Sequence, residues 1–137
     1  LGSQAIQSPN REDMFFMQGA GAVLDREGDL LKRASARINS YKIYCNSIGC
    51  EFVFVAIPNK ETIFWELAGL ERQPTFVGIL NHKLNSEGTK TIDAVRVFDT
   101  LLKQGIVPYH YDDSHWNIYA VKAVAKEIPQ SIFGPRG

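Results

Sequence analysis

Apolar residues recur every three or four positions between residues 30 and 45, and the charged residues among them fall on the opposite side. This spacing predicts a long amphipathic helix. Asp29 is its candidate N-cap, and Gly49 supplies the stop. Residues 52–57, FVFVAI, then form a continuous β-branched and aromatic run, which is typical of a strand buried on both faces. Pro58 ends this strand.

Weaker patterns predict the remaining elements. Residues 4–12 are polar, and we expect them to be loose. The expected elements and connections are a strand at 14–17 ended by Gly19 and Gly21, an irregular connection at 61–74, a helix from Phe76 that closes at Glu87 and Gly88, a strand at 94–98, a short helix from Asp99 to Gly105, a weak strand at 106–109, and a helix from Trp116 to Ile128 that Pro129 breaks.

The alternation of helices with apolar strands predicts an α/β fold with a parallel sheet built from β-α-β crossovers. A length of 137 residues corresponds to one domain, which we assign to residues 11–128, after a loose segment at 1–10 and before a tail at 129–137. Three strands make a thin sheet, and the last helix has no following strand. We therefore expect that the chain ends before its domain does, and that unpaired strand edges lead to self-association.

The charge balance and the lengths of the apolar runs indicate which kinds of partner this chain can have. Fifteen Lys and Arg residues balance fifteen Asp and Glu residues, so the formal net charge is zero. A protein that grips a phosphate backbone usually carries a basic excess, so we expect no nucleic-acid partner. No apolar run approaches the roughly 18 residues that span a bilayer. The first residues also lack the basic head and apolar stretch of a signal peptide.

Cys45 and Cys50 are five positions apart, a spacing that matches no zinc motif. Two interpretations remain open from the sequence. The thiols are small buried apolar groups, or they form a local disulfide in an oxidising compartment.

The segment at 111–117, YDDSHWN, follows a predicted strand and precedes a predicted helix, where α/β folds usually carry reactive side chains. If the loop is extended, Asp113 can accept the Nδ1–H of His115 and leave Nε2 free as a general base. In the alternative interpretation, Asp112, Asp113 or Ser114 caps the helix and His115 is partly buried. A metal site at His110, Asp112, Asp113 and His115 is disfavoured, because adjacent ligands on one strand diverge, and we expect neither metal nor cofactor.

Three segments together resemble the SGNH-hydrolase-like domain of alginate and other exopolysaccharide O-acetyltransferases. Residues 52–64 are similar to that family's strand ending in a proline-x-lysine turn, and residues 97–102 to its valine–aspartate strand end. Residues 111–117 resemble its aspartate–Thr/Ser–histidine–tryptophan signature, the most specific of the three. The resemblance runs from about residue 11 to about residue 128.

This resemblance implies a flavodoxin-like three-layer sandwich in a protein exported to the periplasm. By matching positions, Asp113 and His115 are the acid and base of a Ser-His-Asp triad. The family's serine lies in a downstream Gly-Asp-Ser motif, which this chain lacks, and Ala120 stands where the family usually has glycine. We therefore expect the N-terminal part of an enzyme that is inactive by itself.

Four further residues are candidates for binding substrate: Lys60, Tyr111, Trp116 and Asn117. Trp116 stacks on a sugar ring or packs beneath the loop, and Lys60 binds an anionic sugar or is a solvated lysine in a turn. The implied partners are a polysaccharide, an acetyl donor and other subunits of an acetylation complex. The rival interpretation is a non-catalytic module that binds glycan or such a subunit.

Overall fold

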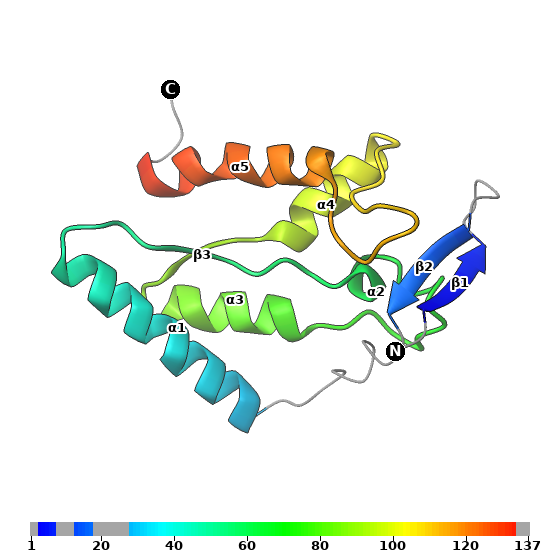
Figure 1. Cartoon of the computed structure of the whole chain (residues 1–137). Coiled ribbons are helices and arrows are strands. Elements are labelled where there is room, and N and C mark those ends of the chain that lie inside the picture. The colour runs from blue at the N-terminus through cyan, green and yellow to red at the C-terminus, as the bar shows by residue number, and fades with distance from the viewer. Residues whose placement is uncertain (1–2, 8–12, 18–27, 134–137) are drawn as a thin grey trace.

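The computed structural model describes residues 3–7, 13–17 and 28–133 of the chain (Figure 1). The elements in chain order are β1 (Ser3–Gln7), β2 (Asp13–Met17), α1 (Asp29–Ser47), β3 (Val53–Val55), α2 (Lys60–Ile63), α3 (Phe76–Ser86), β4 (Lys90–Ile92), α4 (Ala94–Lys103) and α5 (Ile118–Phe133). No helix within these residues is both long and apolar enough to cross a membrane.

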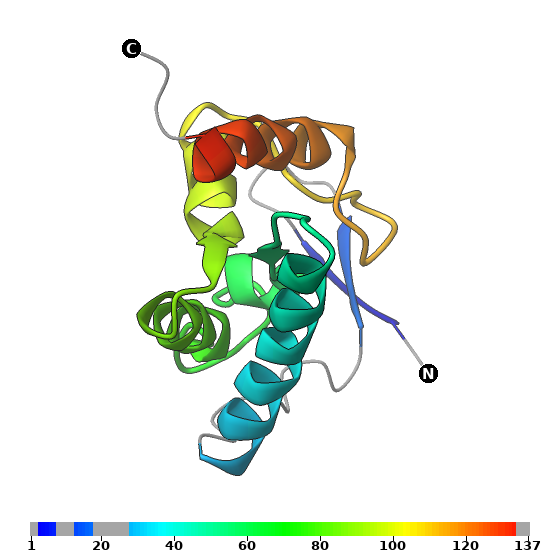
Figure 2. The ribbon, with the colours of Figure 1, turned by 90° about the vertical axis from the view of Figure 1, so that its left-hand side faces the viewer.

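A parallel pair of strands lies at the centre of the fold. β3 pairs with β4 in a register that places Val53 opposite Lys90 and Val55 opposite Ile92. The chain passes through α3 between the two strands, which makes the β-α-β crossover that parallel pairing requires. α3 lies on one side of the pair and α5 on the other (Figures 1 and 2). The predicted α/β class is confirmed at this level.

A second, antiparallel sheet joins β1 to β2, with Ser3 opposite Met17 and Gln7 opposite Asp13. The strand expected at 14–17 is therefore present. The expectation of a loose segment at 4–12 is wrong for residues 4–7, because β2 supplies hydrogen-bonding partners for that strand. Residues 8–12, Gly19 and Gly21 lie outside the described residues.

The strand expected at 94–98 is wrong, because these residues begin α4. Asp93 caps this helix, and its Oδ1 accepts the backbone N–H of Arg96 at 3.1 Å. The buried residues Ala94, Val97, Phe98 and Leu101 recur at helical spacing. This helical spacing is recognisable only over the full length of the helix, because residues 94–98 taken by themselves fit a short apolar strand as well. The helix expected from Asp99 thus begins one turn earlier, and the second parallel strand is β4.

Several other boundaries differ from those expected. β3 is shorter than residues 52–57, and its side chains are only half-buried. The strand at 106–109 is reduced to a single bridge between Tyr109 and Trp116. Residues 61–63, expected to belong to an irregular connection, are part of α2.

Two helix ends also differ. Gly28, and not Asp29, is the N-cap of α1, and Asp29 lies in the first turn. Pro129 lies inside α5, which continues to Phe133. The ring of Pro129 is exposed near the end of the helix, where one missing backbone hydrogen bond does not stop the last turn.

The core lies between β4, α2, α4 and α5. Its buried members are Ile63, Ile92, Ala94, Val97, Phe98, Leu101, Tyr109, Ala120 and Val124. Three aromatic rings extend it toward the segment that joins α4 to α5. Tyr109 meets Phe98 edge-on at 5.5 Å between centroids, and Trp116 lies 6.3 Å from Phe98. The residues between Tyr109 and Trp116 are therefore anchored to the core at both ends.

Candidate functional site

The loop at residues 109–117 carries the predicted signature and lies between α4 and α5 (Figure 1). Its base is closed by the bridge between Tyr109 and Trp116 and by two backbone hydrogen bonds. His110 N–H donates to the carbonyl of His115 at 3.2 Å, and Asn117 N–H donates to the carbonyl of Pro108 at 2.9 Å. The loop therefore returns to its starting point, and Asp113 lies near its tip.

Asp113 and His115 contact each other as expected. His115 Nδ1 lies 2.7 Å from Asp113 Oδ1, and the same oxygen accepts the backbone N–H of His115 at 3.1 Å. The side-chain hydrogen bond with His115 is the main reason why the pKa of Asp113 lies below its ordinary value. An ionised Asp113 accepts only, so Nδ1 carries the proton and Nε2 is the basic nitrogen. Both side chains are exposed, at 51% for Asp113 and 76% for His115.

The alternative interpretation of this segment is wrong for the helix cap and for the burial of His115. Asn117 caps α5, because its Oδ1 accepts the backbone N–H groups of Tyr119 at 3.1 Å and Ala120 at 3.3 Å. Its Nδ2 donates to the carbonyls of Val107 at 2.7 Å and Tyr109 at 3.2 Å. Both ends of this amide are occupied by the backbone, so Asn117 does not fit the substrate contact expected for it.

Lys60 is the first residue of α2, beyond the carboxyl end of β3, and its side chain reaches the loop from below. The residue is 1% exposed. Its Nζ donates to the carbonyls of His110 at 2.5 Å, Tyr111 at 3.2 Å and Asp113 at 2.8 Å. An ammonium group has three hydrogens, so none is left for a ligand. Lys60 is therefore neither a solvated lysine nor a sugar contact, but the residue that holds the loop in place.

An aromatic ring and several acidic side chains also lie near this ammonium group. The Nζ of Lys60 lies 5.7 Å from the centre of the Phe16 ring. Burial lowers the pKa of Lys60, and the negative charges of Asp113, Glu61 and Asp112 partly offset this effect. Glu61 is itself buried, and its Oε1 has no hydrogen-bond partner within the described residues.

The two aromatic candidates differ in their surroundings. Trp116 is half-buried and packs against Phe98, as in the packing interpretation. Tyr111 lines a cavity of about 540 Å³ at the base of the loop, which Asn117 also lines. This volume lies within the roughly 300–1,000 Å³ of typical ligand pockets. Asp113 and His115 are not among the residues that line it.

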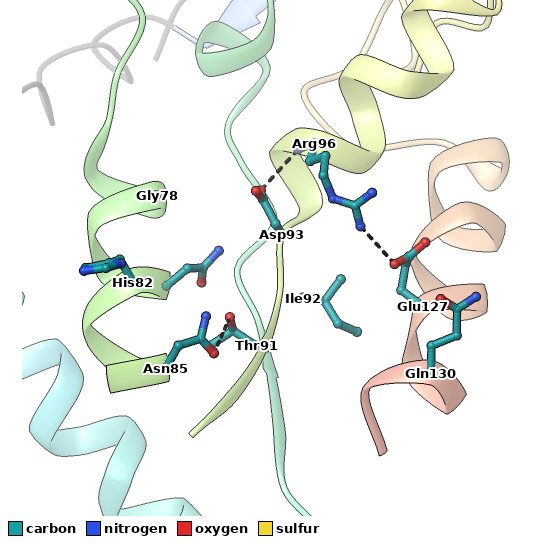
Figure 3. A pocket seen from close by; sticks show the side chains of 10 residues that line it. Gly78, His82, Asn85, Thr91, Ile92, Asp93, Arg96, Glu127 and Gln130 are labelled. Carbon is teal, nitrogen blue, oxygen red and sulfur yellow. Dashed lines mark hydrogen bonds and ion pairs between the residues drawn. The ribbon is translucent and has the colours of Figure 1, made fainter. Parts of the chain in front are cut away.

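A second cavity, of about 660 Å³, lies between α3, β4 and α5 (Figure 3). Arg96 and Glu127 lie next to each other along one side of it, with Arg96 Nη2 and Glu127 Oε2 3.0 Å apart. Thr91 Oγ1 donates to Asn85 Oδ1 at 3.1 Å. None of the candidate residues from the sequence lines this cavity. The strand that leads to this cavity is β4, and it was expected at residues 94–98, so no pattern in the sequence indicated the cavity.

Two other expected chemistries can be compared with the structure. Within the described residues, no group of three or more His, Cys, Asp or Glu side chains is placed to hold a metal ion. Cys45 is half-buried and Cys50 is exposed, so the interpretation of both as buried apolar thiols is wrong. Both thiols are free in this structure.

Asp113 is the one hydrogen-bond partner of the His115 side chain within residues 3–7, 13–17 and 28–133. The described part of the chain therefore places an acid and a base together without a hydroxyl or thiol nucleophile bonded to the base. No family model matches this chain, and the searches of curated proteins and of solved structures found no similar protein.

Proposed function

We propose that this chain carries the acid and base of an acyl-transfer site, in an extracytoplasmic enzyme that moves acetyl groups onto the hydroxyls of a polysaccharide. His115 is the general base and Asp113 orients it. The observation that carries this proposal is the 2.7 Å contact between Asp113 Oδ1 and His115 Nδ1, which leaves Nε2 on an exposed imidazole. The resemblance of residues 111–117 to the O-acetyltransferase signature supplies the reaction class.

The reaction has two half-steps. In the first, His115 Nε2 takes the proton of a serine hydroxyl, the serine oxygen attacks the acetyl carbonyl of the donor, and the imidazolium protonates the leaving group. In the second, Nε2 takes the proton of a sugar hydroxyl, whose oxygen attacks the acetyl-serine. Asp113 stays ionised throughout and stabilises the imidazolium. Within the described residues no serine hydroxyl bonds His115, so the proposal assigns the nucleophilic serine to another polypeptide segment.

The exposure of His115 is compatible with a nucleophile that arrives from another segment. An imidazole that is 76% exposed can meet a serine without any movement of its own loop. Precise placement still matters, since an error of about 1 Å can cost on the order of 10²-fold in rate. Lys60 supplies this placement by bonding three carbonyls of the loop.

The second candidate function is a non-catalytic module that binds a partner subunit or another copy of the chain. Large apolar side chains on two helices favour it, because such surfaces often mark protein contacts. The exposed residues are Tyr41, Ile43 and Tyr44 on α1, Ile48 at its end, and Ile118, Tyr119, Val121, Ile128 and Phe133 on α5. A monodisperse monomer in light scattering, with no shift over a hundredfold range of concentration, would exclude self-association through these faces.

Hydrolysis of a chromogenic acetate ester tests the proposed reaction. We expect no turnover by the 137-residue chain, and turnover by the polypeptide that the same gene encodes through a downstream Gly-Asp-Ser segment. In that longer polypeptide, His115→Ala should lower kcat by about 10⁴-fold or more. The matched control is His82→Ala, which should keep full activity.

Two results would contradict the proposal in different ways. Turnover by the 137-residue chain that depends on His115 would show that the nucleophile lies within it. An active longer polypeptide that is indifferent to His115→Ala would show that the base has been assigned wrongly.

A further inference from the structure

Three helices of this chain end in the same backbone motif. Gly49 after α1, Gly88 after α3 and Gly105 after α4 all have φ near +75°, at 75°, 75° and 76°. In each case the next N–H donates to the carbonyl five residues earlier, at 2.9 Å: Cys50 to Cys45, Thr89 to Leu84 and Ile106 to Leu101. The glycine N–H groups donate to the carbonyls of Asn46, Asn85 and Leu102. These are the two hydrogen bonds of the Schellman motif.

In a Schellman motif, the side chains at the two ends of the six-residue turn usually touch each other. Two of the three motifs here show such pairs facing the interior. Leu84 and Thr89 are both buried, at 0% and 1% exposure. Leu101 is a member of the core, and Ile106 packs against that core. In both motifs the first and last side chains therefore lie on the buried side of the turn.

At the end of α1 the same two positions are occupied by Cys45 and Cys50. A disulfide requires the two Cβ atoms to approach within about 3.5–4.5 Å. The 2.9 Å hydrogen bond from Cys50 N–H to the Cys45 carbonyl already holds the two backbones together. Ile48 and Gly49, which complete the turn, are exposed, and no Cβ at Gly49 would meet another atom within 4 Å, so the turn has room to adjust.

We propose that Cys45 and Cys50 are the site of a reversible disulfide that locks the C-terminus of α1. The inference is independent of the proposed acyl transfer, because it involves none of the same residues. With a small-molecule disulfide such as oxidised glutathione as oxidant, the exposed Cys50 reacts first. Its thiolate attacks one sulfur of the glutathione disulfide, displaces one glutathione thiolate and forms a mixed disulfide. The Cys45 thiolate then attacks the Cys50 sulfur and releases the second glutathione. Two thiols lose two electrons and two protons, and one glutathione disulfide becomes two glutathione thiols.

The structural consequence concerns the turn into β3. Glu51 follows Cys50 directly and β3 begins two residues later, and Glu51 Oε2 lies 3.0 Å from Lys90 Nζ. In the reduced chain, backbone hydrogen bonds hold the turn at the end of α1, and exposed helix ends open readily. The disulfide closes a short covalent loop over the same turn. The oxidised chain should therefore protect the backbone amides of this turn from exchange.

The test is oxidation of the whole chain in a glutathione redox buffer, followed by mass spectrometry under non-reducing conditions. We expect the wild type to lose 2 Da as a monomer, with an effective thiol concentration above about a millimolar. Cys45→Ser should trap one glutathione on Cys50, and Cys50→Ser should react with glutathione more slowly because Cys45 is half-buried. Hydrogen exchange should show slower exchange at Gly49 and Cys50 in the oxidised wild type.

Gly49→Ala tests the role of the motif itself, because a non-glycine residue disfavours the left-handed conformation by about 1–2 kcal/mol, a ratio of about five to thirty. We expect the effective concentration of the two thiols to fall by up to that ratio. Gly88→Ala places the same strain at the equivalent position of α3 and should leave it unchanged. Three results would overturn the proposal. The wild type could form intermolecular dimers alone, or it could keep the mixed disulfide with glutathione. The effective concentration of the thiols could also respond equally to Gly49→Ala and Gly88→Ala.

Discussion

Replacement of Lys60 by methionine removes the ammonium group and keeps an unbranched side chain of similar length. Hydrogen bonds that involve a charged donor contribute about 1.5–3 kcal/mol each, and Lys60 makes three of them with loop carbonyls. Two effects reduce the total. The buried charge is costly, as the lowered pKa of Lys60 indicates, and carbonyls of the exposed loop can bond to water once the loop opens. We therefore expect Lys60→Met to lower the free energy of unfolding by about 2–4 kcal/mol.

Urea unfolding of the two proteins measures this difference, with Lys126→Met as the control. Lys126 is exposed on α5, so its replacement should change stability by no more than about 0.5 kcal/mol. If Lys60→Met is as stable as Lys126→Met, Lys60 does not hold the loop and the argument for its role fails.

The pH dependence gives a second measure of the same group. A folded-state pKa below the ordinary 10.5 means that the unfolded chain binds the proton more tightly. The cost of the buried charge is fully present below the folded-state pKa, and it is relieved as the pH rises from there toward 10.5. The stability of the wild type relative to Lys60→Met should therefore increase in that window. A difference that stays flat up to pH 10.5 would show that the amine is not buried as a cation.

Three further predictions concern the same loop. The lowered pKa of Asp113 means that its contribution to stability is present above pH 3.8 and is lost as the pH falls below that value, so the advantage of the wild type over Asp113→Asn in urea should disappear there. Asn117→Ala should lower stability by about 1–3 kcal/mol, through loss of the α5 cap and of two carbonyl contacts, and Asn117→Asp should recover the cap alone. Tyr109→Phe removes the buried hydroxyl that donates to the Pro58 carbonyl and should cost about 1–3 kcal/mol, with no change in the urea slope.

The helices could be predicted from the sequence wherever the apolar period lasted long enough. α1, α3 and α5 each show it over three turns or more, and they lie close to their expected positions. Residues 94–98 gave the wrong answer because five apolar or charged residues fit a strand as well as the first turns of a helix. The interpretation overlooked Asp93, although a carboxylate directly before such a run is typical of a helix N-terminus.

The contact between Asp113 and His115 could be predicted because the two residues are neighbours in the sequence, and their geometry depends on one local turn. The roles of the residues around them could not. Asn117 was expected to bind substrate, yet its Nδ2 donates to the carbonyls of residues 107 and 109 and its Oδ1 caps α5. The sequence alone does not show whether a polar side chain in such a segment contacts a ligand or bonds the backbone.

The role of Lys60 could not be predicted, because it depends on contacts between residues that are far apart in the sequence. The lysine is separated by 50 or more residues from the carbonyls that it bonds, and it reaches them because β3 and α2 place it beneath the loop. Every residue has a backbone carbonyl, so the identities of residues 110–113 do not indicate that their carbonyls accept hydrogen bonds from a distant lysine. The position of the Asp113–His115 pair is thus set by a lysine at the start of α2, far away in the sequence. In the proposed acyl-transfer site, two separate parts of the chain act as one unit: Lys60 holds the loop in place through its three carbonyls, and Asp113 and His115 supply the acid and base.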